Sequence, residues 1–511
     1  MSTEVELKLS ARPADLPELK RALLAMTPGS IATREQLTST YYDTQTLALH
    51  ERGLSLRVRE QEGCFTQTIK AEDATAGGML SRGEWEDALA ENRPNADAPL
   101  GGPHLPQGSG TDLRPLFVTD VTRTMVEIEP RAGTRIEAAI DEGEVRLTDG
   151  NAVEPISEIE LELKCGEAVA LCDIALQMLE LAGVRVETRS KSERGYRLAS
   201  GSETAIPVHA EPLTLERDMP VEAALREIGR NCLGQLIGNE AAVLAGHSEG
   251  VHQMRVAARR IRSAVSSLKK MLPAQDRNWL AHELGWLAGT LGPARNLDVF
   301  ADELLPAARG SLPDEPGWED LAAILGRLRQ EAYEQVWQAV LAERYTATML
   351  HLLRWFEGCG WRGNQTPEEA VLGASPIGEV ATQVLDRRRR KLRHRGKGFG
   401  KQTPPERHKL RIAVKQLRYT TELFSSLFDK SELQMFARTL KRLQDDLGYA
   451  NDVRVAHEFA VDLFGQSEPR SASGHAWIVM LEWHDLALAA GERRLRRHVR
   501  GLKDASPFWR D

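Results

Sequence analysis

The first 200 residues contain short segments in which apolar and polar positions alternate, such as residues 4–9, 54–59 and 158–164. A period of two is typical of strands that bury one face, and stretches rich in Gly, Pro and Asp separate these segments. We therefore expect antiparallel strands over most of this part of the chain.

Three stretches of the N-terminal part depart from this pattern. Helical spacing runs from about residue 16 to 26 and from about 167 to 181, and Gly183 predicts a C-cap for the second helix. Residues 93–110 are rich in Pro and Gly, which predicts a long surface loop. Helices and a loop therefore flank the expected sheet.

From Met219 onward nearly every segment has helical spacing, and Leu, Ala, Arg and Glu dominate. Residues 199–218 are polar, include two prolines and follow neither period, which is typical of a linker. The predicted fold class is therefore α+β and multidomain, with a β domain over residues 1–200, a linker over 201–218 and an all-α domain over 219–511.

The helical part contains an internal repeat. Residues 252–262 (HQMRVAARRIR) align with residues 408–418 (HKLRIAVKQLR), and Leu291-Gly292 aligns with Leu447-Gly448 at the same offset. Two separate matches at one offset indicate a duplication. We expect two similar helical bundles.

The composition is that of an ordinary globular protein with more than one domain. Of 511 residues, 41% are hydrophobic and 27% charged, which excludes disordered and fibrous classes. No apolar run is long enough for a membrane span, and the N-terminus lacks a signal region, so we expect a soluble, cytoplasmic chain without a membrane partner. Five scattered cysteines without a CxxC pair predict buried thiols rather than disulfides or a zinc site.

The net charge of −8 conceals a division between the two parts of the chain. Residues 1–200 contain 22 Lys and Arg against 34 Asp and Glu, whereas the remainder contains 44 against 40. Eleven of the 13 histidines also lie after residue 200. The two parts are therefore expected to have different chemistry.

Charged residues recur at every second position of several predicted strands. Glu4, Glu6 and Lys8 share one strand face, and Arg57 and Arg59 share another. The further charged positions of this kind are Lys70, Arg82, Glu84, Glu86, Arg123, Glu127, Glu129, Glu158, Glu160, Glu162, Lys164, Arg189 and Lys191.

A solvated face would explain any single strand of this set. Like charges repeated on one face destabilise a sheet unless something neutralises them. Paired carboxylates can bind a hard divalent cation, and Arg and Lys rows can bind phosphate. The set therefore predicts a metal and polyphosphate site, on the inner face of a closed barrel if the sheet closes.

The order of these short motifs resembles the CYTH family, also called triphosphate tunnel metalloenzymes. The resemblance covers nearly all of residues 1–200 and implies a tunnel of eight antiparallel strands that binds a linear triphosphate. The motifs that carry it are Glu4-Val-Glu6-Leu-Lys8, Tyr41-Tyr42-Asp43, Leu56-Arg57-Val58-Arg59, Thr68-Ile69-Lys70, Arg82-Gly83-Glu84, Ile140-Asp141, Glu158-Ile159-Glu160-Leu161-Glu162-Leu163-Lys164 and Ser190-Lys191-Ser192-Glu193-Arg194.

The resemblance also implies roles for individual residues, with Mg²⁺ or Mn²⁺ as the metal. The residues implied to bind phosphate are Lys8, Arg57, Arg59, Lys70, Arg82, Arg123 and Lys191. The implied metal ligands are Glu4, Glu6, Glu160 and Glu162, and the resemblance leaves the roles of Asp141 and Glu158 open. The residues expected to be catalytic are Glu4, Glu6, Lys8, Arg57, Arg59 and Lys70.

The repeated motif of the helical part places a histidine and three cations on one helix face in each copy. These residues are His252, Arg255, Arg259 and Arg262 in the first copy and His408, Arg411, Lys415 and Arg418 in the second. A solvated amphipathic face would explain one helix, but its duplication and the basic run at 387–397 favour a polyanion partner. The helices resemble CHAD domains, which implies binding of inorganic polyphosphate; Asn296 departs from the usual Asp.

As a whole, the chain resembles the bacterial CYTH–CHAD inorganic triphosphatases. The predicted function is metal-dependent hydrolysis of inorganic triphosphate to diphosphate and phosphate, with polyphosphate bound by the helical domain. The alternatives are a nucleoside or thiamine triphosphatase, since Tyr41 and Trp85 leave base binding open, and a non-catalytic polyphosphate-binding protein. Nucleic acid is disfavoured because the basic helices lack interleaved aromatic residues apart from Tyr419.

Overall fold

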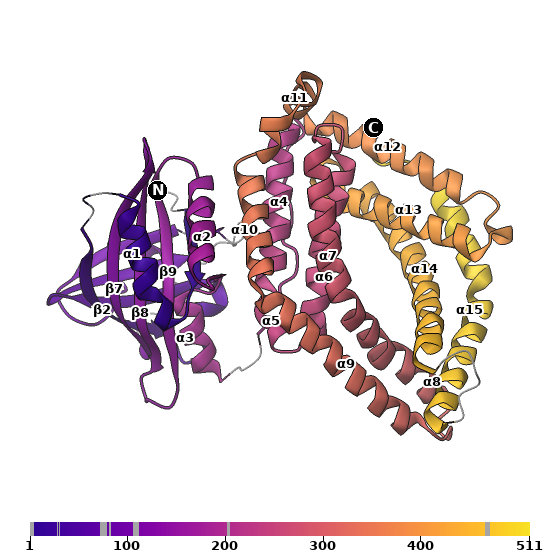
Figure 1. The fold of residues 1–511 in the computed structure, drawn as a ribbon, viewed down its shortest axis with the longest axis horizontal. Helices are drawn as coiled ribbons and strands as arrows, with labels where there is room; N and C mark the ends of the chain where they lie inside the picture. Colours follow the sequence, from indigo (N-terminus) through magenta and orange to yellow (C-terminus); the bar gives the residue numbers. More distant parts are fainter. Residues whose placement is uncertain are drawn as a thin grey trace. The chain divides into compact units, whose positions relative to one another are not determined.

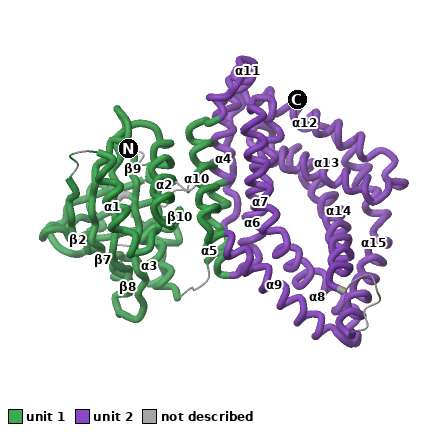
Figure 2. The backbone as a smooth tube through the Cα atoms, in the orientation of Figure 1, with its two compact units in different colours: residues 1–207, 233–245, 340–360 green, residues 208–232, 246–339, 361–511 purple. Residues whose placement is uncertain are grey.

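The computed structural model describes residues 5–27, 29, 31–71, 79–80, 83–105, 112–201, 205–464 and 471–510. The chain forms two compact units, which Figure 2 draws in different colours. Unit 1 consists of residues 1–207, 233–245 and 340–360, and unit 2 of residues 208–232, 246–339 and 361–511. Unit 1 therefore combines the N-terminal part of the chain with two short segments from the helical half.

Unit 1 is built on one antiparallel sheet of ten strands (Figure 1). The strands are β1 (Glu6–Ser10), β2 (Thr33–Asp43), β3 (Leu54–Gln61), β4 (Cys64–Ala71), β5 (Met79–Leu80), β6 (Gly83–Leu89), β7 (Arg114–Arg131), β8 (Thr134–Leu147), β9 (Val153–Cys165) and β10 (Arg185–Val186). Their order is β10-β1-β9-β8-β7-β2-β3-β4-β6, and β5 pairs with β1. Strand β6 pairs with β4, so β5 and β6, which are adjacent in sequence, pair with strands near both ends of this order.

The period of two that predicts these strands also sorts their side chains. In β3, Leu56 and Val58 are buried among apolar residues that include Leu49 and Ile69. Arg57 and Arg59 alternate with them and therefore point to the opposite face. The same alternation places the charged positions of the other strands on one face of the sheet.

Short helices complete unit 1. They are the α-helices α1 (Leu16–Ala25), α2 (Val169–Leu181), α3 (Lys191–Ser200), α5 (Glu240–Leu244) and α10 (Glu343–Glu357), and the 3₁₀ turns η1 (Pro13–Asp15), η2 (His50–Arg52) and η3 (Gly102–His104). Helices α1 and α2 confirm the two helices expected from the sequence. The turn η3 lies in the expected loop at 93–110, of which residues 106–110 lie outside the described part of the chain.

Two local predictions for this unit are wrong. Gly183 does not cap α2, because Ala182 at the helix end already has extended dihedrals (φ −153°, ψ 158°) and the chain continues directly towards β10. Lys191 lies not on a strand but at the start of α3, because the Ser190 hydroxyl accepts a hydrogen bond from the Glu193 amide (3.1 Å) and caps that helix.

The cysteine prediction is only partly right. All five cysteines are free thiols, and Cys172, Cys232 and Cys359 are buried as expected. Cys64 and Cys165 are exposed, because they occupy the first residue of β4 and the last residue of β9, where the strands leave the core.

Unit 2 consists of helices. Besides α4 (Val221–Gly238), which spans both units, its elements are α6 (Ser248–Ser267), α7 (Ala274–Val299), the π-helix η5 (Phe300–Leu304), α8 (Leu305–Ser311), α9 (Trp318–Leu341), η6 (Gly360–Asn364), α11 (Pro367–Ala374), α12 (Ile377–Arg395), η7 (Phe399–Lys401), α13 (Pro404–Leu423), η8 (Ser425–Leu427), α14 (Lys430–Phe464) and α15 (Ala472–Asp504). Among the helices of the described residues, none combines the length and the apolar character that crossing a membrane requires.

The internal repeat falls on two corresponding helix pairs of unit 2. The His-led motifs lie on α6 and α13, and the Leu-Gly pairs lie on the helices that follow, α7 and α14. Side chains of α6 and α13 meet, because the hydroxyls of Ser267 and Thr420 lie 3.2 Å apart in a hydrogen bond. The division into two duplicated bundles stays a prediction.

Candidate functional site

A cavity of about 400 Å³ is lined by side chains from eight strands and from the start of α3. Its charged lining comprises Glu6, Lys8, Glu35, Arg57, Arg59, Lys70, Glu84, Glu86, Arg123, Glu137, Asp141, Glu160, Glu162 and Lys191. Nine of these residues belong to the predicted phosphate and metal sets. Of the remaining predicted positions, Glu4 and Arg82 lie outside the described residues, while Glu127 and Glu129 are exposed.

Strand register brings the charges of neighbouring strands together. Lys8 of β1 lies opposite Glu160 of β9, and Arg123 of β7 lies opposite Asp141 of β8. Asp141 in turn lies opposite Glu158. Opposite residues of an antiparallel pair have Cβ atoms about 5 Å apart, so this register gathers carboxylates and cations at one place.

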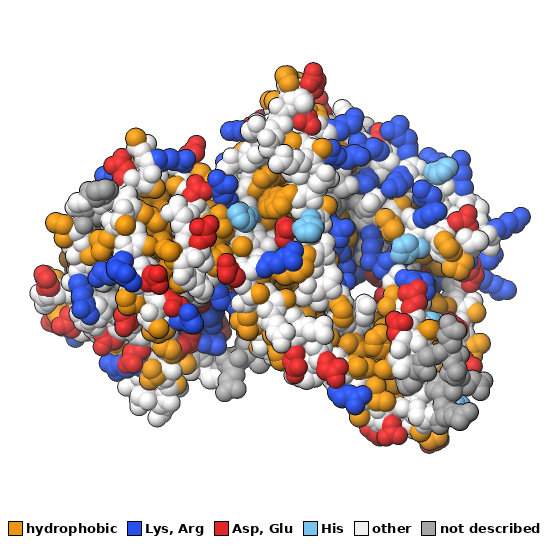
Figure 3. All heavy atoms as spheres, viewed as in Figure 1, with side chains coloured by type: hydrophobic (Ala, Val, Ile, Leu, Met, Phe, Trp, Pro, Cys, Tyr) orange, Lys and Arg blue, Asp and Glu red, His pale blue; other side chains and the backbone are white. Residues whose placement is uncertain are grey.

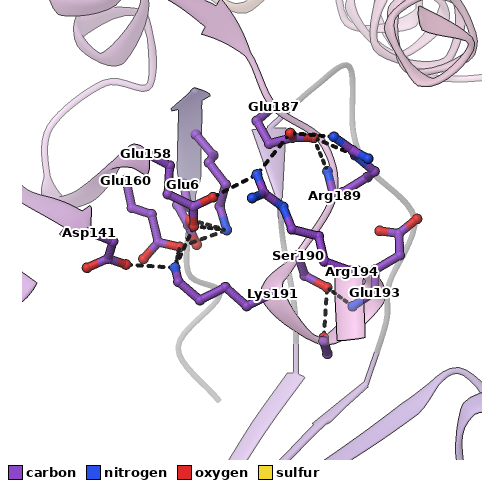
Figure 4. A network of polar contacts seen from close by, with 12 residues as sticks. Glu6, Asp141, Glu158, Glu160, Glu187, Arg189, Ser190, Lys191, Glu193 and Arg194 are labelled. Atoms are coloured by element: carbon purple, nitrogen blue, oxygen red, sulfur yellow. Dashed lines mark hydrogen bonds and ion pairs between the residues drawn. The ribbon is translucent and has the colours of Figure 1, made fainter. Parts of the chain in front are cut away.

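Lys191 is at the centre of this acidic cluster (Figure 4). Its Nζ atom lies 2.7 Å from an oxygen of Asp141, 2.5 Å from Glu158 and 2.8 Å from Glu160. Lys8 Nζ lies 2.7 Å from the same Glu160 oxygen and 3.4 Å from Glu158. Arg123 forms a bidentate pair with Asp141 (2.8 and 2.6 Å) and also contacts Glu160.

The cluster keeps its acids and bases charged. Burial by itself raises the pKa of Glu160, but Lys191 and Lys8 outweigh it and hold that pKa well below its usual value. Burial likewise lowers the pKa of Lys8, yet Glu158 and Glu160 bring it above its usual value. Glu6 differs, because burial and the neighbouring Glu160 raise its pKa. Lys8 and Glu160 are therefore held in their charged forms, whereas Glu6 is more easily protonated.

The strands β3, β4 and β6 supply a second, more basic part of the lining. Lys70 Nζ lies 3.1 Å from Glu84, and Arg57 Nη2 lies 3.5 Å from the same carboxylate. Arg57 and burial lower the pKa of Arg59 to about 10, because two guanidinium groups repel each other here. The Nε atom of Arg57 is buried and has no hydrogen-bond partner among the described residues. These groups offer charge and donors to a bound anion.

In unit 2, α6 and α13 bring part of the two basic stripes together. Arg259, Arg262 and Lys415 line one cavity, and the Arg259 guanidinium carbon lies 5.8 Å from the centre of the Tyr419 ring. His408 and Arg411 line another cavity. Burial and Arg295 lower the pKa of His252 to about 4, and burial with Arg411 lowers that of Lys415 to about 7.

Two stripe residues make contacts within the protein instead. Arg255 donates a hydrogen bond to the Ala288 carbonyl (3.0 Å), and Arg418 pairs with Glu422 (2.7 Å). On the face that Figure 3 draws, Lys and Arg side chains gather over unit 2 near α12 and α13. Part of the basic side chains of α12 and α13 therefore reaches the surface.

Comparison with known families matches both parts of the chain. The CYTH domain matches residues 2–196, and the CHAD domain matches residues 227–461. The chain carries a CYTH domain and a CHAD domain. The acidic and basic cavity therefore lies within the residues of the CYTH match, and the basic stripes lie within those of the CHAD match.

Individual relatives cover the two domains unequally. An inorganic triphosphatase of Haemophilus influenzae is 33% identical over 203 residues, which are 39% of this chain and 56% of that protein, so the match spans little more than half of this relative. The crystal structure of the CHAD domain from the plant Ricinus communis covers 59% of this chain and 99% of its own, at 26% identity and a TM-score of 0.49. A putative adenylyl cyclase from Hippeastrum, described as having a dominant triphosphatase activity, covers 39% and 96% at 17% identity and a TM-score of 0.30.

A carboxylate set suited to a divalent metal lies at the wall of the CYTH cavity, where Asp141 and Glu160 line the cavity and Glu158 is buried beside them. This set differs from the predicted one. Three carboxylate oxygens lie within 4.8 Å of one another, one from each of Asp141, Glu158 and Glu160. Oxygen donors at this spacing fit a hard cation such as Mg²⁺ or Mn²⁺. Of the predicted ligands, Glu160 belongs to this set, while Glu6 and Glu162 line the same cavity and Glu162 also lies 2.5 Å from Lys164. The roles of Asp141 and Glu158 could not be predicted from the sequence, because only the register between β8 and β9 places these two residues opposite each other.

Arg194, which has no role predicted from the sequence, contacts the carboxylate cluster on the side away from the cavity. Its side chain is 5% exposed, and its Nη2 atom lies 3.1 Å from Glu158 and 3.0 Å from Glu187. Glu187 also pairs with Arg189 (3.0 Å), so the cluster continues into a second layer (Figure 4). The Ser190 and Glu193 pair, spaced as in a capping box, is a sequence signal that could have located this helix and its inward-facing side chains.

Proposed function

We propose that the CYTH domain hydrolyses inorganic triphosphate to diphosphate and phosphate with the help of Mg²⁺ or Mn²⁺. One observation carries this proposal: a single cavity is lined both by the basic group of Arg57, Arg59 and Lys70 and by the carboxylates of Asp141 and Glu160. Glu158 is buried next to these two carboxylates. Polyphosphate needs cations along its length, and phosphoryl transfer needs positioning and charge stabilisation more than covalent help. The activity named for the Haemophilus relative supports the same reaction.

The cavity favours a bare phosphate chain over a nucleotide. Tyr41 lines the cavity but stacks on Phe117, with ring centres 4.6 Å apart. Trp85 stacks on His104 at 3.7 Å and packs with the apolar cluster of β3 and β4, on the opposite side of β6 from Glu84 and Glu86. Both rings are thus occupied by internal contacts, which supports inorganic triphosphate against the nucleoside and thiamine alternatives.

We further propose that the sheet closes into an eight-stranded tunnel. Strands β5 and β6 are separated by residues 81–82 alone, and they pair with β1 and β4 respectively. If β5 and β6 act as one strand, the order β1-β9-β8-β7-β2-β3-β4 returns to β1. Enclosure would lower the dielectric around the substrate and strengthen each ionic contact.

The reaction then follows from the side chains of the cavity. Arg57, Arg59 and Lys70 bind phosphate oxygens and stabilise the charge that develops on the bridging oxygen as its bond to the terminal phosphorus breaks. A water molecule forms the new bond to that phosphorus, and a carboxylate of the cluster accepts its proton. Diphosphate leaves with the bridging oxygen.

Asp141, Glu158 and Glu160 would hold the metal ion, with Glu6 and Glu162 beside them on the lining. When bound, the ion would neutralise charge on the phosphate oxygens and so favour attack at phosphorus. Lys8, Arg123 and Lys191 already compensate these carboxylates, and they lower the pKa of Asp141 and Glu160, so both stay ionised for the metal.

For the CHAD domain we propose binding of inorganic polyphosphate along the basic stripes of α6 and α13. The proposed residues are those of the repeated motif: His252, Arg255, Arg259, Arg262, His408, Arg411, Lys415 and Arg418. Convergence of Arg259, Arg262 and Lys415 on one cavity supports this proposal. A bound polyanion would neutralise the repulsion between these closely spaced cations. Its affinity should fall as the salt concentration rises.

A phosphate-release assay tests the catalytic proposal. Tripolyphosphate, ATP, thiamine triphosphate and long-chain polyphosphate are offered to the full chain with Mg²⁺, Mn²⁺ or EDTA. We expect rapid release from tripolyphosphate only when metal is present. Activity confined to ATP or thiamine triphosphate would reject inorganic triphosphate as the substrate and favour the nucleoside or thiamine alternative. No activity on any of the four compounds would favour a non-catalytic polyphosphate-binding protein.

A further inference from the structure

The cavity between α6, α7, α12 and α13 has a composition that polyphosphate binding leaves unexplained. Its volume is about 470 Å³, which is within the usual range for small-molecule sites. The lining comprises Arg259, Arg262, Ser263, Val265, Ser266, Lys269, Arg277, Leu280, Ala281, Leu284, Arg388, Ile412, Lys415, Gln416 and Tyr419. All of these residues belong to unit 2.

The charged part of this lining is entirely cationic. It includes six Lys and Arg residues, and no Asp or Glu occurs among the described residues that line the cavity. The Nε atoms of Arg259, Arg277 and Arg388 and the hydroxyl of Ser263 are buried without a hydrogen-bond partner in the described part of the chain. Because Arg259, Arg277 and Arg388 line the cavity and no carboxylate of the described lining offsets their charge, the cavity is suited to an anion.

The rest of the lining is apolar. Val265, Leu280, Leu284 and Ile412 contribute to the wall, and Ile412 remains 39% exposed on α13. Tyr419 adds an aromatic ring beside Arg259. Bare polyphosphate presents only hydrated oxygens and gains nothing from an apolar wall, whereas a ligand with an apolar ring buries surface against it.

We propose that this cavity binds an organic phosphate, a phosphate ester with a planar apolar group, such as a nucleotide. Its phosphates would contact the Arg and Lys side chains, and its ring would lie against Ile412 and Tyr419. The cavity shares Arg259, Arg262 and Lys415 with the proposed polyphosphate stripe, so the inference rests in part on that function and extends it from an inorganic chain to an organic phosphate.

Photolabelling of the full chain with 8-azido-ATP in EDTA tests this proposal at the level of the site. After irradiation, proteolysis and mass spectrometry locate the label. We expect label on peptides that contain Ile412 to Tyr419 or the α7 residues 277–284. Absence of label from these peptides at millimolar 8-azido-ATP would overturn the proposal, whatever is labelled in the CYTH domain.

Substitution of the apolar wall separates ring recognition from charge. Ile412→Ser removes apolar surface without changing charge, and we expect it to lower labelling at the cavity at least fivefold. Met435→Ser, at a 73% exposed position of α14, is the matched control and should leave labelling unchanged. Equal labelling of the wild type and Ile412→Ser would overturn the role of the wall, and thermal melting verifies that both variants fold.

Competition and retention assays distinguish this proposal from polyphosphate binding itself. Unlabelled ATP should displace the label from the cavity at least tenfold more effectively than tripolyphosphate, although tripolyphosphate has the greater charge density. Equal or better displacement by tripolyphosphate would overturn ring recognition. If the chain is retained on immobilised polyphosphate but the cavity is not labelled, the organic-phosphate inference is rejected and polyphosphate binding stands. If the cavity is labelled but the chain is not retained, the organic-phosphate inference is supported and polyphosphate binding is rejected.

Discussion

At the scale of single residues, the position of Arg57 is the most direct test of the CYTH cavity. It lies on the inner face of β3 beside Arg59, and its buried Nε has no partner among the described residues. We expect Arg57→Ala to lower the turnover of tripolyphosphate about 100-fold. In other enzymes, removing one preorganised donor to the transition state has an effect of this size. Phosphate release measures the effect.

The matched control is Arg131→Ala, which removes an arginine whose side chain is 50% exposed and pairs with Glu167 outside the cavity. It should retain wild-type turnover. If both variants were equally active, phosphate binding at Arg57 would be rejected.

Lys191 gives a prediction about metal affinity that does not depend on turnover. Its ammonium group contacts one oxygen of each proposed metal ligand, so a metal ion must compete with it for them. Lys191→Gln removes the competing charge and leaves a more negative cluster. We expect Mn²⁺ to bind this variant at least about tenfold more tightly than wild type without substrate, because charge interactions are strong in buried sites.

Isothermal titration calorimetry with Mn²⁺ measures this change in the full chain, and Lys164→Gln serves as a control outside the triad of ligands. Lys191→Gln should also lose turnover, because Lys191 lines the cavity and the loss of its positive charge weakens the binding of phosphate there. An unchanged or weaker Mn²⁺ affinity would indicate that the metal does not bind at Asp141, Glu158 and Glu160.

Lys415 predicts a pH dependence of polyphosphate binding. Burial and Arg411 lower its pKa to about 7, so the amine loses its proton as the pH rises through neutrality. A polyanion binds the protonated form better, so retention on immobilised polyphosphate should weaken between about pH 6 and 8. Lys415→Arg keeps its charge over this range and should reduce the dependence, whereas an identical pH profile would exclude Lys415 as its source.

At the scale of secondary-structure elements, the packing of α3 positions Lys191. Gly195 of this helix faces Phe117 of β7 so closely that an added Cβ would lie 2.1 Å from the ring. Gly195→Ala should therefore lower stability by about 1–3 kcal/mol, the usual cost of overpacking, and should lower turnover because the start of α3 moves. Thermal unfolding and phosphate release measure the two effects.

Gly285→Ala in α7 is the corresponding control, since an added Cβ there meets no atom within 4 Å. Alanine favours helix more than glycine does, so this variant should be neutral or slightly more stable. Equal stability of Gly195→Ala and wild type would show that α3 can shift without cost.

The elements also show what the sequence could and could not predict. Alternation predicted the strands and the inward direction of Arg57 and Arg59, because a period of two is a local property. It could not predict that Asp141 faces Glu158, since register depends on pairing between separate strands. The start of α3 was missed because its hydrogen-bonded cap outweighs the apparent alternation of Arg189 and Lys191.

At the scale of the whole molecule, unit 1 is assembled from distant parts of the chain. Helices α5 and α10 come from the helical half, yet Arg354 of α10 pairs with Asp173 of α2 (2.5 Å) within this unit. Arg185 of β10 pairs with Glu240 of α5 (2.9 Å). The linear pattern placed one boundary near residue 200 because composition changes there, and such a pattern cannot reveal later segments that pack back onto the sheet.

Glu240 makes this assembly sensitive to pH. Burial raises its pKa from 4.5 to about 7, although Arg185 opposes the shift. Between these two values the folded protein holds more protons at this group than the unfolded chain, so the free energy of unfolding should fall as the pH rises from about 4.5 to 7. Glu240→Gln cannot ionise and should reduce this slope. It leaves Arg185 without a charged partner mainly above about pH 7, where wild-type Glu240 is ionised, so the variant should lose stability there.

Calorimetric melting of the full chain from pH 5 to 8 measures the slope for wild type and variant. Glu319→Gln on α9 is the control, because Glu319 is 80% exposed and its loss should leave the slope unchanged. If Glu240→Gln melted with the wild-type pH dependence, another group would be responsible. A reduced slope would show that the segments from the helical half contribute to the stability of the unit that contains the CYTH cavity.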